Sequence, residues 1–148
     1  MVSVATADHH SITVEDIDAQ IAFYRDVLGL ELFDHGTLEQ GSDDAEAFST
    51  LTGLEGVSLD IAHLEAEGAM VELVEYHTPD GDDLRPFEAN DTGATHFCFR
   101  TDDLATAVED LAGDVDFISD PVTFSSGVDA VYFRDPEGNL MEILERPD

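Results

Sequence analysis

The chain has 148 residues, of which 35 are acidic and only 5 are basic, so its formal net charge is −30. This charge strongly disfavours binding to nucleic acid or to an anionic membrane surface. The length favours one domain, residues 1–148, with a core of its own. The single cysteine, Cys98, excludes an intramolecular disulfide.

The distribution of charge and hydrophobicity indicates where the protein works. Carboxylates are spread along the whole chain rather than gathered in a tail. At molar salt the Debye length is about 3 Å, so the repulsion among them is largely screened. We therefore expect an adaptation to a high-salt cytoplasm. The sequence shows neither a secretion signal nor an apolar run long enough to span a membrane, which favours a soluble cytoplasmic protein.

Two stretches of the sequence resemble each other. Residues 8–17 and 95–104 each begin with a histidine in a short alternating run that leads into acidic residues and an aliphatic helix start. The spacing between equivalent positions is 87 residues throughout, from His9 to His96 and from Ile17 to Leu104. A repeat of this length indicates two modules rather than a solenoid.

The first module has the pattern of a strand, a helix and three further strands. Alternation predicts a strand over 9–14, and Asp16 is placed to cap a helix that ends at Gly29. Strands are expected at 30–34, 57–64 and 69–76, the last two joined by a turn at 67–68. The polar stretch 36–56 is expected to be a loop with a short helix around 44–51.

The second module repeats this order after a linker. Residues 77–92 read as a linker or a mobile loop over one face. A strand is then predicted over 95–101, a helix through Leu111, and strands near 116–118, 130–134 and 140–144. The expected architecture is α+β, with tandem βαβββ modules at about 1–80 and 93–146.

Each module carries a histidine in its first strand and a glutamate in the middle of its last strand. The glutamates are Glu72 and Glu142, and apolar strand residues flank both. Burying an unpaired carboxylate costs several kcal/mol, on the order of 3–5. A divalent metal bound by two imidazole nitrogens and two carboxylate oxygens would explain both glutamates. The competing interpretation is that both lie on a solvated strand face of an acidic protein.

Several strings in the sequence are similar to those of the vicinal oxygen chelate superfamily, which includes glyoxalase I, methylmalonyl-CoA epimerase, bleomycin-resistance proteins and extradiol dioxygenases. They occur along nearly the whole chain. The matching stretches are 8–14, Phe23-Tyr24-Arg25-Asp26-Val27-Leu28-Gly29-Leu30, 71–73, 93–97, Phe133-Arg134-Asp135-Pro136-Glu137-Gly138-Asn139 and 141–143.

The resemblance implies paired βαβββ modules that form a curled mixed sheet around a metal cavity. It also implies one divalent ion per site, Ni, Co, Mn, Fe or Zn, with His9, Glu72, His96 and Glu142 as its ligands. The expected reaction is a proton transfer, of the isomerase, epimerase or glyoxalase I-type lyase class. In it the metal stabilises an enolate or enediolate, and Glu142 or Glu72 serves as the base. The expected binding partner is a small-molecule substrate. The chain is also expected to form a homodimer.

Strand alternation then predicts which side chains line the cavity. If the two histidines point to the metal, so do Ser11, Thr13, Cys98 and Arg100. Arg100 is a candidate partner for a substrate carboxylate or enolate oxygen, and Arg85 in the linker is a second candidate anchor. Arg100 could instead pair with a structural carboxylate.

The repeat also separates two adjacent histidines. The constant spacing aligns His9 with His96 and aligns His10 with Phe97, which cannot bind a metal. We therefore expect His9 to be the ligand and His10 to face the core. By default His35, His63 and His77 are read as structural, and Asp60 is a third, weaker candidate for the base.

Other functions of the same superfamily remain open at this level. An Fe(II) ring-cleaving dioxygenase would use two histidines and one glutamate and needs open coordination positions, so a fourth ligand argues against it. A drug-binding resistance protein would need no metal, and an intact set of four ligands argues against that. Glutathione and coenzyme A are both anionic, and the superfamily members that bind them use basic residues. This chain mostly lacks such residues, which argues against either molecule as its substrate.

The charge distribution yields a first prediction. Transferring the protein from molar salt to dilute buffer should unfold it, because self-repulsion of the carboxylates is then unscreened. Circular dichroism melting curves at both salt concentrations measure this. An unchanged melting temperature would contradict the interpretation of the acidic surface.

Overall fold

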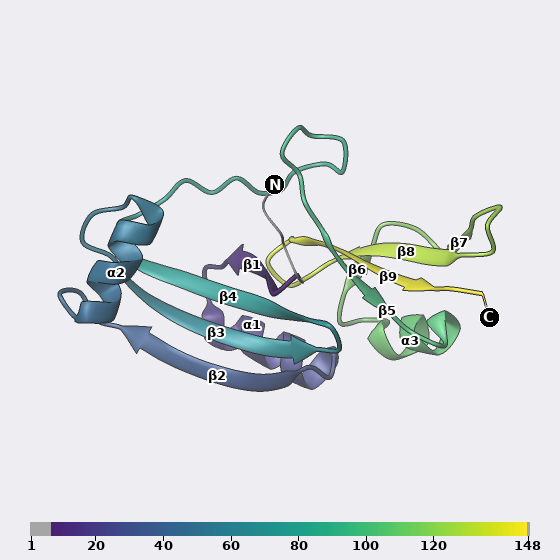
Figure 1. The fold of residues 1–148 in the computed structure, drawn as a ribbon. Coiled ribbons are helices and arrows are strands. Elements are labelled where there is room, and N and C mark those ends of the chain that lie inside the picture. The colour runs from purple at the N-terminus through teal and green to yellow at the C-terminus, as the bar shows by residue number, and fades with distance from the viewer. Residues whose placement is uncertain (1–6, 148) are drawn as a thin grey trace, which may run out of the picture. The chain divides into compact units, whose positions relative to one another are not determined.

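The computed structural model describes residues 7–147, so residues 1–6 and 148 of the expected domain lie outside it. The predicted α+β class is confirmed: the described chain has few helices and two mixed sheets (Figure 1). The chain divides into two compact units, Met1–Asp82 and Asp83–Asp148, each with one sheet. None of the helices in the described part has the length and apolar character needed to cross a bilayer.

Unit 1 contains a four-stranded sheet in the order β1-β4-β3-β2. Strand β1 runs parallel to β4, and the other neighbours are antiparallel. A short π-helix, η1, continues α1. The elements are β1 (His9–Thr13), α1 (Ile17–Ala22), η1 (Phe23–Val27), β2 (Glu31–Leu38), α2 (Asp43–Thr52), β3 (Ser58–Ala66) and β4 (Ala69–Thr78).

Unit 2 repeats this plan with a sheet in the order β5-β9-β8-β6, and β7 pairs with β8. Its first strand, β5, again runs parallel to its last strand, β9. The elements are β5 (Phe97–Arg100), α3 (Leu104–Leu111), β6 (Asp116–Phe117), β7 (Val122–Thr123), β8 (Asp129–Arg134) and β9 (Leu140–Glu145).

Three strands differ most from the sequence-based expectation. Strand β5 is shorter than the predicted 95–101, so His96 directly precedes it. Strand β2 extends to Leu38, beyond the predicted 30–34, because β3 offers it a pairing partner from Leu32↔Leu64 to Leu38↔Leu59. The two-residue strand β7 was not predicted, since its short pairing with Ala130 and Asp129 leaves no periodic signal in the sequence.

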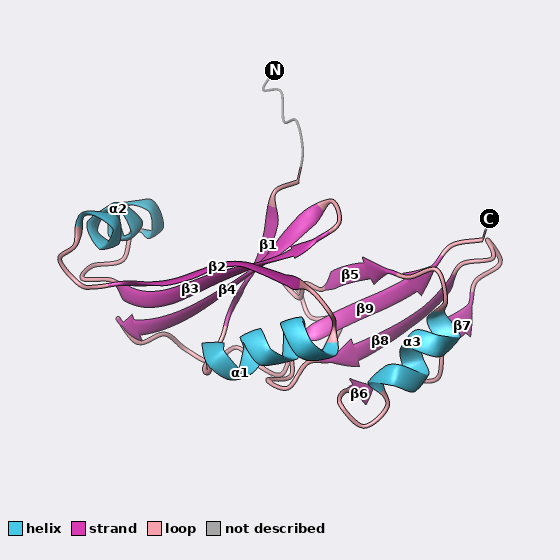
Figure 2. Cartoon of the chain, turned by 90° about the horizontal axis from the view of Figure 1, so that it is seen from below, coloured by secondary structure: helices cyan, strands magenta, loops and turns pink. Residues whose placement is uncertain are grey.

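The sheet of unit 1 has helices on both faces, with α1 and α2 on opposite sides (Figure 2). Val71 and Leu73 of β4 are fully buried on the face toward α1. Part of the other face is apolar, and there Phe48 of α2 packs against a cluster that includes Leu59 and Val74. Glu72 lies on this second face, because neighbouring strand residues point to opposite sides.

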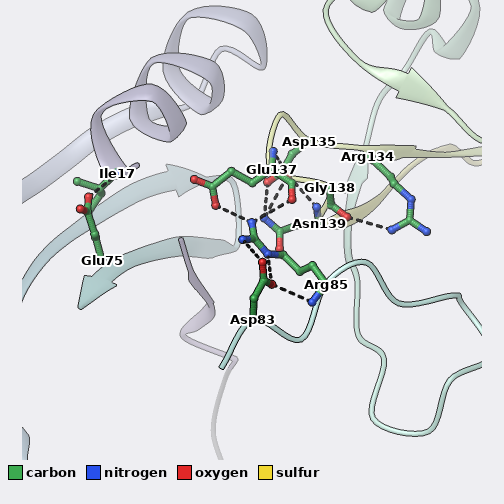
Figure 3. Close-up of polar contacts among 9 residues, drawn as sticks. All are labelled: Ile17, Glu75, Asp83, Arg85, Arg134, Asp135, Glu137, Gly138 and Asn139. Carbon is green, nitrogen blue, oxygen red and sulfur yellow. Dashed lines mark hydrogen bonds and ion pairs between the residues drawn. The ribbon is translucent and has the colours of Figure 1, made fainter. Parts of the chain in front are cut away.

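Each unit uses a second glutamate of its last strand to hold the start of its helix. The Glu75 carboxylate accepts a hydrogen bond from the Ile17 amide at 2.9 Å (Figure 3). In unit 2 the Glu145 carboxylate accepts one from the Leu104 amide at 2.8 Å. Asp16 and Asp103 complete the two caps through their own side chains. A carboxylate at this position compensates unpaired helix amides and the positive end of the helix dipole.

These caps yield a second prediction. Glu75→Gln and Glu145→Gln should each destabilise the protein by about 1 kcal/mol, or lower its melting temperature by about 3 °C, because a charged helix cap becomes neutral. Thermal unfolding at molar salt measures the loss.

The matched control is Glu65→Gln, which removes the same charge from an exposed position of β3. It should leave stability unchanged or slightly raised. If all three variants lose equal stability, the effect belongs to charge removal and not to the helix caps.

Candidate metal centre

In unit 1 the parallel pairing of β1 with β4 brings a histidine beside a glutamate. Ser11 pairs with Glu72, and His9 lies two residues earlier on the same face. The Nε2 atom of His9 is 3.7 Å from Oε2 of Glu72, which is too long for a hydrogen bond. The Glu72 side chain is only 14% exposed. The other ring nitrogen of His9, Nδ1, lies 2.7 Å from Oδ1 of Asp8.

Unit 2 repeats this pairing of a first strand with a last strand. Cys98 of β5 pairs with Glu142 of β9, in the place where Ser11 pairs with Glu72. The Nε2 atom of His96 lies 3.0 Å from Oε2 of Glu142, whose side chain is 17% exposed. Tyr132, opposite Glu142 on β8, places its ring against that of His96, with a centroid distance of 4.9 Å. Each unit therefore holds one histidine–glutamate pair.

A third histidine, His63, was expected to be structural but contacts the glutamate of unit 1. His63 of β3 lies opposite Glu72, and its Nε2 is 2.8 Å from Oε2 of Glu72. Its Nδ1 lies 2.6 Å from Oδ1 of Asp34 on β2. Burial lowers the pKa of His63, but the hydrogen bonds to Asp34 and Glu72 and the negative charges of these two carboxylates together raise it by more, so the net pKa lies above its ordinary value.

The sequence contained a signal for this contact. The two-residue turn at 67–68 pairs Ala66 with Ala69, and counting back along an antiparallel hairpin from there places His63 opposite Glu72. Asp34 had no such signal, because a register irregularity between Leu32 and Asp34 shifts β2 against β3.

The expected cavity residues lie on the same faces as the two glutamates. Ser11 and Thr13 are exposed on the Glu72 face, and Cys98 and Arg100 are exposed on the Glu142 face. Partial burial, with a further contribution from the nearby Glu142 carboxylate, raises the pKa of the Cys98 thiol to about 12. Cys98 is therefore a neutral thiol near pH 7, although solvent still reaches it.

The two arginines expected to bind substrate differ in their surroundings. Arg100 makes neither an ion pair nor a hydrogen bond with any residue between 7 and 147. Arg85 donates hydrogen bonds to Asp83 and, at 3.0 Å, to Glu137, and its side chain is only 15% exposed (Figure 3). The Arg85 guanidinium therefore links Asp83, at the start of unit 2, to the turn at Asp135–Asn139. This structural role was not predicted from the sequence.

The turn of unit 2 is held from both sides. Arg134 donates one hydrogen bond to the Gly138 carbonyl and another to the Phe87 carbonyl. Asp135 is buried and accepts hydrogen bonds from the backbone and side chain of Asn139. The Asp-Pro-Glu-Gly-Asn string is thus a structural feature of this turn.

The remaining candidates lie away from the two glutamates. His10 pairs with the buried Val71, which places it on the core side of β1. Asp60 pairs with Glu75, three residues from Glu72 and therefore on the opposite face of the sheet. There it accepts a hydrogen bond from Thr37 and lies 3.1 Å from Nε2 of His77. This position argues against Asp60 as the base.

The donor atoms suit a divalent metal ion. Each pair combines an imidazole nitrogen with a carboxylate oxygen, a mixture used by Zn, Ni, Co, Mn and Fe. Metal-binding histidines commonly donate their second ring N–H to a carboxylate, as the contact of His9 with Asp8 would allow. Across residues 7–147 no single group of three such side chains is arranged to bind a metal, and the candidate ligands occur as pairs.

Comparison with known proteins agrees with this arrangement of strands. A family model described as the Glyoxalase/Bleomycin resistance protein/Dioxygenase superfamily matches residues 6–143. No curated protein sequence matches the chain.

Solved structures similar to the chain carry related descriptions. A glyoxalase family protein from Bacillus cereus has a TM-score of 0.86 and 25% identity, covering 99% of this chain and 97% of that one. A lactoylglutathione lyase from Agrobacterium tumefaciens has a TM-score of 0.61 and 25% identity, covering 97% and 95%. A glyoxalase/dioxygenase from Nostoc punctiforme, at 23% identity and a TM-score of 0.66, covers 100% and 99% and supports the fold alone. From the family match across nearly its whole length, the chain belongs to the glyoxalase/bleomycin resistance/dioxygenase superfamily, also called the vicinal oxygen chelate superfamily.

Proposed function

We propose that this protein is a metal-dependent enzyme that moves a proton on a small-molecule substrate, as a glyoxalase I-type lyase or an epimerase. The observation that supports it is the matched histidine–glutamate pair in each unit. Both glutamates are mostly buried, at 14% and 17% exposure, and both lie beside a histidine Nε2. A fold element that only stabilised the sheets would have no reason to repeat this costly placement.

The ligands we propose are His9 and Glu72 from unit 1 and His96 and Glu142 from unit 2. When bound, a divalent ion stabilises negative charge that develops on a substrate oxygen. Glu142 and Glu72 are the two candidate bases that take a proton from the substrate carbon. An ionised carboxylate within hydrogen-bonding reach of the substrate C–H can perform this transfer as a general base.

Arg100 is proposed to bind an anionic group of the substrate. It lies on the Glu142 face of β5, it is exposed, and no carboxylate among the described residues occupies its guanidinium. Ser11, Thr13 and Cys98 offer neutral polar contacts beside the same glutamates. Arg85 is a weaker candidate, since Asp83 and Glu137 already satisfy its guanidinium.

The nature of the anion follows from the small number of basic residues. The chain has five arginines. Arg25 is paired with Asp26, and Arg85 and Arg134 are engaged within unit 2. Among the described residues, neither Arg100 nor Arg146 has an ion-pair partner. With so few arginines free to bind an anion, a substrate with a single carboxylate or a small thiol adduct is favoured over a large polyanion such as coenzyme A.

Metal content tests the proposed function directly. Protein purified in molar salt is loaded with Ni, Co, Mn or Zn and passed through gel filtration. Elemental analysis should then find one retained ion for each set of the four proposed ligands. His9→Ala should lose most of the bound metal, because a ligand nitrogen is removed. His10→Ala should retain it, because His10 lies on the core side of β1.

Two results would contradict the proposal. A wild-type protein without stoichiometric metal, whose ligand binding is insensitive to chelator, would favour a drug-binding protein. Metal loss in His10→Ala with retention in His9→Ala would place the ligands on the other face of β1.

The two arginines provide a test of substrate binding. Arg100→Ala should lower kcat/KM by about tenfold or more, as expected for one charge-assisted contact, whereas Arg85→Ala should mainly lower thermal stability. Turnover is measured at molar salt with the thiol adducts of methylglyoxal beside methylmalonyl-CoA. Negligible effects from both variants on turnover would remove the proposed anion contact.

A further inference from the structure

The clearest asymmetry between the two pairs lies around Glu72. In both units the residue opposite the glutamate on the next strand points to the same face, and these residues are His63 and Tyr132. His63 contacts the glutamate itself, with 2.8 Å between Nε2 and Oε2. The Tyr132 hydroxyl instead lies 3.5 Å from Nε2 of His96. Glu72 therefore has a direct partner on the neighbouring strand.

His63, the partner of Glu72, is itself held in place by a second carboxylate, that of Asp34. Oδ1 of Asp34 lies 2.6 Å from Nδ1 of His63, so the imidazole is fixed at both ring nitrogens. An ionised carboxylate only accepts hydrogen bonds, so each of these two contacts places an N–H on His63. Asp34 is 58% exposed, His63 21% and Glu72 14%, so the chain of contacts runs from solvent into the site.

The geometry leaves Glu72 able to bind a cation. Both histidine contacts, from His63 and from the more distant His9, involve Oε2. Its Oε1 atom makes no hydrogen bond with any residue that the structure describes. A carboxylate tethered through one oxygen keeps the other oxygen available in a fixed direction. Metal-binding carboxylates are commonly oriented by such hydrogen bonds.

We propose that His63 and Asp34 are positioning residues, which hold the Glu72 carboxylate in the orientation in which it binds the metal. This inference rests on the proposed function, because it assumes that Glu72 is a ligand. Asp34 acts only through His63, since it contacts the imidazole and not Glu72. The two substitutions should therefore be non-additive.

The experiment is a Co²⁺ titration of metal-free protein at molar salt, followed by the visible absorption of the bound ion. His63→Leu should weaken Co²⁺ binding by about tenfold to a hundredfold, the usual cost of losing such a supporting contact. Asp34→Asn should weaken it less. The double variant should bind within about twofold of His63→Leu, because Asp34 has no route to Glu72 without the imidazole.

The absorption spectrum separates positioning from a general loss of structure. In His63→Leu the Co²⁺ spectrum should shift toward that of Glu72→Gln, because the same ligand is disturbed. His35→Gln is the matched control, since His35 lies next to Asp34 on β2 but on the opposite face, and pairs with Ala62. It should keep the wild-type affinity and spectrum. Asp34→Asn preserves side-chain shape, so it decides the question if His63→Leu does not fold.

The failures are distinguishable. If the wild-type protein binds no Co²⁺, the proposed function falls, and the positioning role falls with it. If the wild type binds Co²⁺ and both His63→Leu and Asp34→Asn match it, only the positioning role is overturned. If His63→Leu loses the metal as completely as His9→Ala, His63 is itself a ligand and the positioning role is also wrong.

Discussion

The site depends on one arrangement of strands, the parallel pairing of the first strand of each unit with its last. This pairing sets Glu72 beside Ser11 and Glu142 beside Cys98, and so places each glutamate two residues along from a histidine on the same face. Because side chains alternate along a strand, the flanking apolar residues turn to the other side and bury there. In each unit the last strand thus contributes apolar side chains to the core from one face and the glutamate from the other.

The same strand also holds the helix. Three residues after each glutamate of the site comes another, Glu75 or Glu145, which points to the opposite face and accepts a hydrogen bond from a helix amide. A spacing of three places two like residues on opposite faces of a strand. One carboxylate therefore stabilises the fold at a helix start, where it accepts a hydrogen bond from an amide, while the other lies on the opposite face beside a histidine.

The two units differ in the residues that lie opposite their glutamates, although they share a plan. In unit 1 two histidines lie near one carboxylate, and one of them is backed by Asp34. In unit 2 a tyrosine takes the place of the second histidine and lies against the ring of His96. A chain with a net charge of −30 and five arginines uses histidine rather than arginine beside these carboxylates. That choice leaves Arg100 without a partner among the described residues.

The sequence by itself determined the α+β class, the repeat, the helix cap at Asp16, and the faces of the first strands. These features are local, because alternation and capping act over a few residues. The hairpin turn at 67–68 could place His63 opposite Glu72, but only the tertiary structure decided that Asp34 contacts His63 and that Arg85 is engaged. These last two contacts join residues 29 and 52 positions apart. They depend on one irregularity in β2 and on the path of the segment before β5, and a local pattern records neither of them.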